Sequence, residues 1–314
     1  AAPPCPSPAG SMIRPMAIAT GSSLVDPEVL GRLHNLSVCA RTIVEGLRAG
    51  AHRSPLKGQS VDFSDHRAYV PGDDLRHLDW KVLGRRDRLV IKRYEAELDL
   101  GCTLAVDGSG SMAYRGTRAI CDKYRYAAVL ASCLAYLVLR EQDRAGLVLF
   151  ADHALHEVRP AGQGQLDRIC RLLEGHTPGA ATAPRSALAQ LAAPASHRGL
   201  VALLTDALVP PDDLAATLAR LRHRGHDVAL LWILDPDELD LEVATVSRFD
   251  GLEGDGSLTA EPKALRRAYQ AEVAAHRLAL EGACRASRVA FVPARTDEPF
   301  HLPLNRLLVA LQRD

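Results

Sequence analysis

From residue 99 onward, short apolar segments alternate with segments of helical periodicity, and this alternation constrains the fold more than any other feature of the sequence. The apolar segments are unbroken, as is typical of strands buried on both faces of a parallel sheet. The helical segments between them are the crossovers that parallel strands require. The expected strands are 100–106, 145–151, 199–205, 227–234 and 288–293, and the expected helices are 119–140, 165–174, 185–192, 211–223, 261–285 and 303–312. We therefore expect an α/β, doubly wound, mostly parallel sheet over about residues 99–314.

The part of the chain before this region has a different composition. Residues 1–25 are rich in Pro, Ala and Ser, and we expect a disordered leader there. Apolar residues at helical spacing predict a helix in 26–50. Residues 51–98 are dense in Pro, Gly, Asp and Arg, which favours turns and short strands, the best of them within "RLVIKRYE". We expect residues 26–98 to form an N-terminal helix and an irregular β segment packed on the sheet.

Charge and cysteine content exclude several classes of protein. Lys+Arg and Asp+Glu both number 38, so the bulk charge gives no indication of a nucleic-acid partner or an anionic membrane. The seven cysteines are scattered and include no C-x-x-C pair, which favours reduced thiols over a disulfide framework or zinc site. The longest apolar run without a charge, 126–139, is shorter than the roughly 20 residues of a bilayer span. We expect a cytoplasmic protein with no membrane span.

Oxygen-bearing side chains follow two of the expected strands. Asp107, Ser109 and Ser111 alternate in "VDGSGSM" directly after the first strand, and Asp206 follows strand 199–205. Because the carboxyl ends of parallel strands meet at one edge of a sheet, we expect these side chains to converge there. The loop residue Thr182 precedes another helical segment and completes the set. Hydroxyl and carboxylate oxygens are hard ligands, so the pattern predicts a site for Mg²⁺ or Mn²⁺.

Two other interpretations use the same residues. The serines can serve as helix caps and Asp206 as a turn residue, which explains each one separately but not their arrival at adjacent strand ends. Alternatively, Ser109 can be the nucleophile of a serine hydrolase on a strand-to-helix turn, with Asp206 and a later histidine such as His301. Such a turn needs glycine two residues before and after the serine, and this chain has Asp107 and Ser111 there. We keep the hydrolase as the minor alternative.

The order Asp-x-Ser-x-Ser, loop Thr, strand-end Asp resembles the metal-ion-dependent adhesion site (MIDAS) of von Willebrand factor A domains. The five positions are filled here by Asp107, Ser109, Ser111, Thr182 and Asp206. The usual G-T-[DN] reads A-T-A at Thr182, and Thr177 lies nearby in the sequence. The resemblance implies a von Willebrand factor A-like fold and a bound Mg²⁺ or Mn²⁺ that takes a carboxylate from another protein.

A second resemblance covers residues 30–300. The stretch "HRSPLKGQSVDFSDHRAYVPGDDLRHLDWKVLGRRDRLVIKRYEAELDL" and the later "DPDELDLEV" and "LRRAYQ" resemble the family known as domain of unknown function 58. That resemblance implies a partnership with a MoxR-type AAA+ ATPase in the assembly or maturation of other proteins. We expect a non-enzymatic adaptor; a structural adaptor with a vestigial metal site is a further alternative. The basic residues before the sheet either pair internally with nearby acidic residues or form a partner-docking face: Arg85, Arg86, Arg88 and Arg93.

Overall fold

The computed structural model describes residues 35–51, 66–68, 90–92, 101–151, 154–179, 198–241, 247–250, 257–260 and 262–312. Several expectations lie outside these residues: the leader 1–25, the helix 185–192, Thr182, and the four arginines Arg85, Arg86, Arg88 and Arg93.

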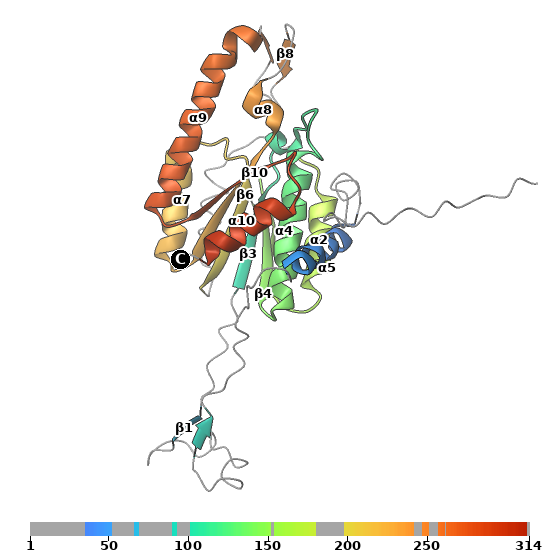
Figure 1. The fold of residues 1–314 in the computed structure, drawn as a ribbon, viewed down its shortest axis with the longest axis vertical. Coiled ribbons are helices and arrows are strands. Elements are labelled where there is room, and N and C mark those ends of the chain that lie inside the picture. Colours follow the sequence, from blue (N-terminus) through green and yellow to red (C-terminus); the bar gives the residue numbers. More distant parts are fainter. Residues whose placement is uncertain are drawn as a thin grey trace, which may run out of the picture.

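A six-stranded sheet forms the centre of the fold, in the order β10-β7-β6-β3-β4-β5 (Figure 1). Its strands are β3 (Gly101–Asp107), β4 (Arg144–Phe150), β5 (Ala154–Ala161), β6 (Gly199–Thr205), β7 (Asp227–Leu234) and β10 (Ala290–Arg295). All neighbours pair in parallel except β5, which is antiparallel to β4. Counted along the chain, the order is 3-2-1-4-5-6, in which the winding reverses between β3 and β6. The expected doubly wound, mostly parallel α/β class is confirmed.

Helices cover both faces of this sheet. On one face lie α4 (Lys123–Arg140), α2 (Leu36–Ala51), α5 (Gln165–Gly175) and α10 (His301–Leu311), while α7 (Pro211–His223) and α9 (Pro262–Ala286) lie on the other (Figure 1). Each face has its own apolar core, because alternate residues of the buried strands point to opposite sides. The N-terminal helix α2 shares the core of α4 and α5, as expected for a helix packed on the sheet. None of the described helices is long and apolar enough to cross a membrane.

Shorter elements complete the described structure. The 3-10 helix η2 (Gly110–Ala113) follows β3, and α8 (Pro236–Asp240) follows β7. Two small antiparallel sheets pair β1 (His66–Ala68) with β2 (Val90–Lys92), and β8 (Ser247–Asp250) with β9 (Ser257–Ala260). Strand β2 lies within the predicted "RLVIKRYE". These elements leave the carboxyl ends of β3, β6 and β7 at one edge of the main sheet, with α8 beyond them (Figure 1).

One strand was not expected, and one helix begins clearly later than expected, whereas several other bounds differ by one or two residues. Strand β5 was not predicted, because its residues "ALHEVRPA" include charges and a proline; both are compatible with its place at the sheet edge. Helix α4 begins at Lys123 rather than at 119, since Asp122 caps it by accepting a hydrogen bond from the backbone N–H of Arg125 at 2.7 Å. The residues before Asp122 instead form a loop that continues from η2.

Candidate metal centre

The predicted site residues that the structure describes come together where the winding of the sheet reverses. Asp107 is the last residue of β3, and Asp206 directly follows β6. Because Val106 is in register with Leu204 in these parallel strands, the two carboxylates extend from adjacent strand ends. Ser109 and Ser111 are also buried, at 0% and 8% exposure. In doubly wound sheets this switch point is where ligands bind.

The carboxylate of Asp107 is held by two hydrogen bonds. The backbone N–H of Ser109 donates to its Oδ1 at 3.0 Å, and the hydroxyl of Thr205 donates to its Oδ2 at 2.6 Å. The Thr205 Oγ1 in turn accepts the backbone N–H of Ala207 at 3.0 Å. Thr205 therefore fixes Asp107 across the β3–β6 boundary, a role that its position beside Asp206 in the sequence did not reveal.

The two serine hydroxyls lie side by side. The turn of η2 brings Ser109 Oγ to 3.1 Å from Ser111 Oγ. In an octahedral shell with ligands at about 2.1 Å, neighbouring oxygens are about 3 Å apart. The hydroxyls thus have the spacing of two adjacent ligands of a Mg²⁺-sized ion.

Electrostatics at the strand ends favour a cation. The pKa of Asp107 is raised to about 6, first because burial penalises the carboxylate and second because the charge of Asp206 repels it. Within the described residues there is no cluster of three or more His, Cys, Asp or Glu that could hold a metal. A cation here would therefore depend on serine hydroxyls together with the two carboxylates, the donor set that suits Mg²⁺ or Mn²⁺.

A buried lysine also belongs to this centre. Lys123 Nζ lies 2.9 Å from Asp206 Oδ2 and 2.6 Å from Glu238 Oε1, and its side chain is 0% exposed. Burial alone would lower the pKa of this lysine, but the two carboxylates outweigh burial and raise it. For Glu238 burial has the opposite effect: it raises the pKa of this carboxyl, although the charge of Lys123 acts to lower it. The sequence carried only a weak signal for Lys123, a positive charge in the first turn of a helix, where the dipole disfavours it, and Arg125 in the same turn shares that signal.

Helix α8 ties the loop after η2 to the sheet. Asp235 is fully buried and accepts hydrogen bonds from the backbone N–H of Gly116 at 2.8 Å and from the Thr296 hydroxyl at 3.1 Å. It also caps α8 in a capping box with Glu238. Asp237 accepts the backbone N–H of Thr117 at 2.6 Å. Asp235 and Asp237 thus fasten the segment that links Ser111 to Lys123.

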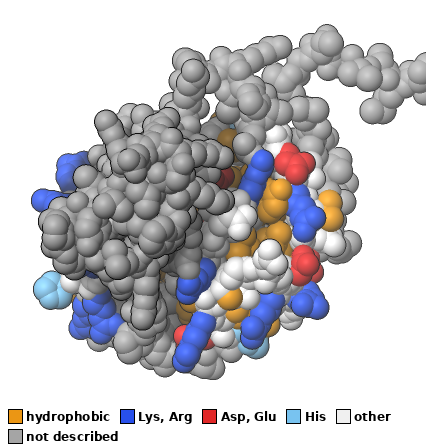
Figure 2. All heavy atoms as spheres, turned by 90° about the horizontal axis from the view of Figure 1, so that it is seen from below, with side chains coloured by type: hydrophobic (Ala, Val, Ile, Leu, Met, Phe, Trp, Pro, Cys, Tyr) orange, Lys and Arg blue, Asp and Glu red, His pale blue; other side chains and the backbone are white. Residues whose placement is uncertain are grey.

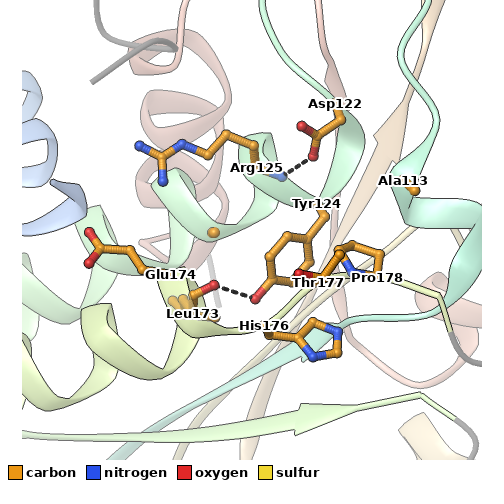
Figure 3. A pocket seen from close by; sticks show the side chains of 10 residues that line it. Ala113, Asp122, Tyr124, Arg125, Leu173, Glu174, His176, Thr177 and Pro178 are labelled. Carbon is orange, nitrogen blue, oxygen red and sulfur yellow. Dashed lines mark hydrogen bonds between the residues drawn. The ribbon is translucent and has the colours of Figure 1, made fainter. Parts of the chain in front are cut away.

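A small pocket of mixed polar and apolar lining adjoins the candidate metal centre (Figure 3). It has a volume of about 270 Å³ and lies between the start of α4 and the end of α5. Tyr124 donates its hydroxyl to the Leu173 carbonyl at 2.8 Å, and His176 faces Tyr124 edge-on. His176 Nε2 also lies 3.0 Å from the Gly108 carbonyl oxygen. Thr177 lines this pocket and is exposed.

The geometry gives no support to the hydrolase alternative. Among the described residues the hydroxyl of Ser109 hydrogen-bonds to Ser111, and no histidine hydrogen-bonds to it. His301 is an exposed residue at the first position of α10. The general base that a serine nucleophile requires is therefore not found beside Ser109 in this part of the chain.

Comparison with solved structures finds proteins of low sequence identity. The conserved hypothetical protein BatB from Bacteroides thetaiotaomicron matches at 14% identity with a TM-score of 0.46, over 68% of this chain and 99% of that one. An aerotolerance-related membrane protein from Bacteroides fragilis matches at 16% identity with a TM-score of 0.47, over 68% and 99%. The VWA domain of SpRpn10 matches at 10% identity with a TM-score of 0.31, over 66% and 94%.

Sequence comparison finds relatives over nearly the whole chain. Uncharacterized proteins of Mycobacterium tuberculosis and Mycobacterium bovis are each 27% identical over 316 residues, which cover 98% of this chain and 97% of the relative. The model of the family described as "Protein of unknown function DUF58" matches residues 65–279, which include Asp107, Ser109, Ser111 and Asp206. The chain therefore belongs to the DUF58 family.

Proposed function

We propose that this protein is a non-enzymatic interaction module that binds a partner protein through a Mg²⁺ or Mn²⁺ ion. The observation that carries the proposal is the meeting of Asp107, Ser109, Ser111 and Asp206 at the switch point of the sheet. These residues would hold the ion, and Thr182 is proposed as the fifth ligand. When bound, the ion would offer a Lewis-acidic coordination position to a carboxylate of the partner.

Each residue of the centre has its own part in this mechanism. Thr205 and the Ser109 backbone N–H hold the carboxylate of Asp107 in one orientation. The serine hydroxyls are neutral, so they provide ligands without adding negative charge. With only two carboxylates against a divalent ion, and Lys123 beside one of them, the centre stays attractive to an anionic group of a partner.

The partner that we propose is a MoxR-type AAA+ ATPase or one of its client proteins, in the cytoplasm. Support for this choice comes from the family resemblance and not from the site. The basic residues Arg85, Arg86, Arg88 and Arg93 are proposed as an additional docking face. Figure 2, which views the molecule from below and away from the candidate centre, shows described Lys and Arg side chains interspersed with acidic and hydrophobic ones.

The test is calorimetric titration of the protein with a purified MoxR-type ATPase from the same organism. Binding should occur in Mg²⁺, be lost in EDTA, and fall in the Ser109→Ala and Asp206→Ala variants. The matched control is Ser37→Ala, which removes a hydroxyl on α2 that bonds to Asp167. A contribution from the arginine face should weaken as salt is raised, because exposed charges are screened. Equal binding in EDTA and in both site variants would refute metal dependence.

A further inference from the structure

Lys123 occupies a position that packing alone does not explain. It is the first residue of α4, and residues 126–135 of that helix, like Lys123 itself, are all buried. A cation in the first turn of a helix is opposed by the helix dipole, and a buried ammonium loses its hydration. Replacing a buried ion pair with apolar side chains of similar volume is often neutral or stabilising. Apolar side chains in place of Lys123 and both of its carboxylate partners would therefore fold about as readily, whereas removing the lysine alone would leave Asp206 and Glu238 without their cation. Stability alone does not explain why this cluster is charged, which indicates a role for the charge at the candidate metal centre.

The Lys123 ammonium is surrounded by two carboxylates and one aromatic ring. Nζ contacts Asp206 Oδ2 on one side and Glu238 Oε1 on another, and the ring of Tyr114 lies 5.9 Å from it. Asp206 is the carboxylate that the candidate metal centre takes from β6. Lys123 and a divalent cation would therefore share one carboxylate.

We propose that Lys123 competes with the divalent cation for Asp206, and so lowers the affinity of the centre for the cation while making the loaded centre more attractive to a carboxylate. The inference rests on the proposed function. Asp107 and Asp206 together carry two negative charges, which a divalent cation alone would neutralise. The ammonium makes the loaded centre one charge more positive than an uncharged side chain would, whether or not Glu238 is counted. With Glu238 counted the loaded centre is neutral, and with an uncharged side chain at position 123 it would carry one negative charge, which would repel a carboxylate.

Glu238 gives a test in the opposite direction. It accepts one hydrogen bond from Lys123 and so draws part of the ammonium charge away from Asp206. Glu238→Gln removes that second carboxylate and leaves Lys123 to pair with Asp206 alone. Cation binding should therefore become weaker in Glu238→Gln, whereas it should become tighter in Lys123→Met.

The experiment is titration of the full chain with Mn²⁺, followed by calorimetry and by the shift of the thermal melt. Lys123→Met should bind Mn²⁺ at least tenfold more tightly than the wild type, and Glu238→Gln should bind it several-fold more weakly. Lys123→Met leaves the buried Asp206 and the partly exposed Glu238 without their cation. The double variant Lys123→Met/Glu238→Gln is therefore compared with Glu238→Gln as a second measure of what the loss of Lys123 does to Mn²⁺ binding. The control is Arg118→Gln, which removes a cation that pairs with Asp237 and Asp240 and not with Asp206.

Acetate serves as a simple carboxylate probe. A fixed acetate concentration should tighten Mn²⁺ binding by a larger factor in the wild type than in Lys123→Met. If the wild type and Lys123→Met bind Mn²⁺ equally tightly, or if acetate tightens Mn²⁺ binding by the same factor in both, the inference is overturned and the proposed function still stands. Binding by Lys123→Met but not by the wild type would support the inference and contradict metal dependence of the native protein. If neither protein binds Mn²⁺, the proposed function is overturned, and the inference with it.

Discussion

The buried carboxylate of Asp235 offers a direct test of how the loop beside the metal centre is held. Its oxygens accept three hydrogen bonds, from the Gly116 backbone N–H at 2.8 Å, the Asp237 backbone N–H at 2.9 Å and the Thr296 hydroxyl at 3.1 Å. Gly116 and Thr296 lie 119 and 61 residues away in the chain, so Asp235 joins three separate segments. Asp235→Ala removes all three bonds at once.

The loss of stability expected for Asp235→Ala depends on which of the three donors can hydrogen-bond to water instead. The Asp237 N–H opens a short surface helix and can be hydrated, but the bonds from Gly116 and Thr296 are buried. A hydrogen bond to a charged acceptor contributes about 1.5–3 kcal/mol, and a stranded buried donor costs about as much. Counting the two buried bonds, Asp235→Ala should lower the free energy of unfolding by about 3 kcal/mol or more. That is a large fraction of the roughly 5–15 kcal/mol that stabilises a typical domain.

Equilibrium urea unfolding, followed by circular dichroism, measures this cost. The matched control is Asp240→Ala, which removes a carboxylate from the same helix. The Asp240 side chain is 41% exposed and pairs with Arg118 at 2.6 Å, so its loss should cost less than about 1 kcal/mol. If Asp235→Ala and Asp240→Ala destabilise the protein equally, Asp235 does not fasten the loop and the reasoning is wrong.

Three further predictions concern the core and the thiols. Gly199→Ala should destabilise the protein by about 1–3 kcal/mol in urea unfolding, since its Cβ would overlap the Gly101 carbonyl of β3; Gly282→Ala, in open space on α9, should instead stabilise it by up to about 1 kcal/mol. Tyr126→Phe should cost about 1 kcal/mol by the same measurement, because the Tyr126 hydroxyl donates to the Glu298 carbonyl at 2.9 Å. In the native protein, six of the seven thiols are buried, and burial raises their pKa values, so they should react with Ellman's reagent at pH 8 only as fast as the protein unfolds: Cys39, Cys102, Cys121, Cys133, Cys170 and Cys284. Rapid labelling of any of these six would contradict the prediction.

The sequence predicted the sheet well where a segment had one dominant property. Strands 199–205 and 227–234 and helix 211–223 match their predicted bounds, because unbroken apolar runs and helical periodicity leave little ambiguity. It failed where local pattern and tertiary position diverge. Strand β5 has a polar sequence because it lies at an edge of the sheet, and Val38, an apolar residue of the N-terminal helix, is 49% exposed.

The residues proposed as ligands could be predicted from the sequence, but the side chains that support them could not. Asp107, Ser109, Ser111 and Asp206 follow strands, so the topology alone brings them together. Lys123 of α4 contacts Asp206, and Glu238 of α8 contacts Lys123, although the two helices lie far from each other in the sequence. Only the way these helices pack across the strand ends makes them neighbours, and no local pattern encodes that packing.

The most direct test of the metal centre is an anomalous difference map from crystals of the protein grown with Mn²⁺. We predict one strong peak within about 2.2 Å of the hydroxyl oxygens of Ser109 and Ser111, at the ends of β3 and β6. Crystals of Asp107→Ala grown in the same way should lack this peak. Wild-type crystals that show no peak there at millimolar Mn²⁺, or a peak that persists in Asp107→Ala, would contradict the assignment of these residues as a metal centre.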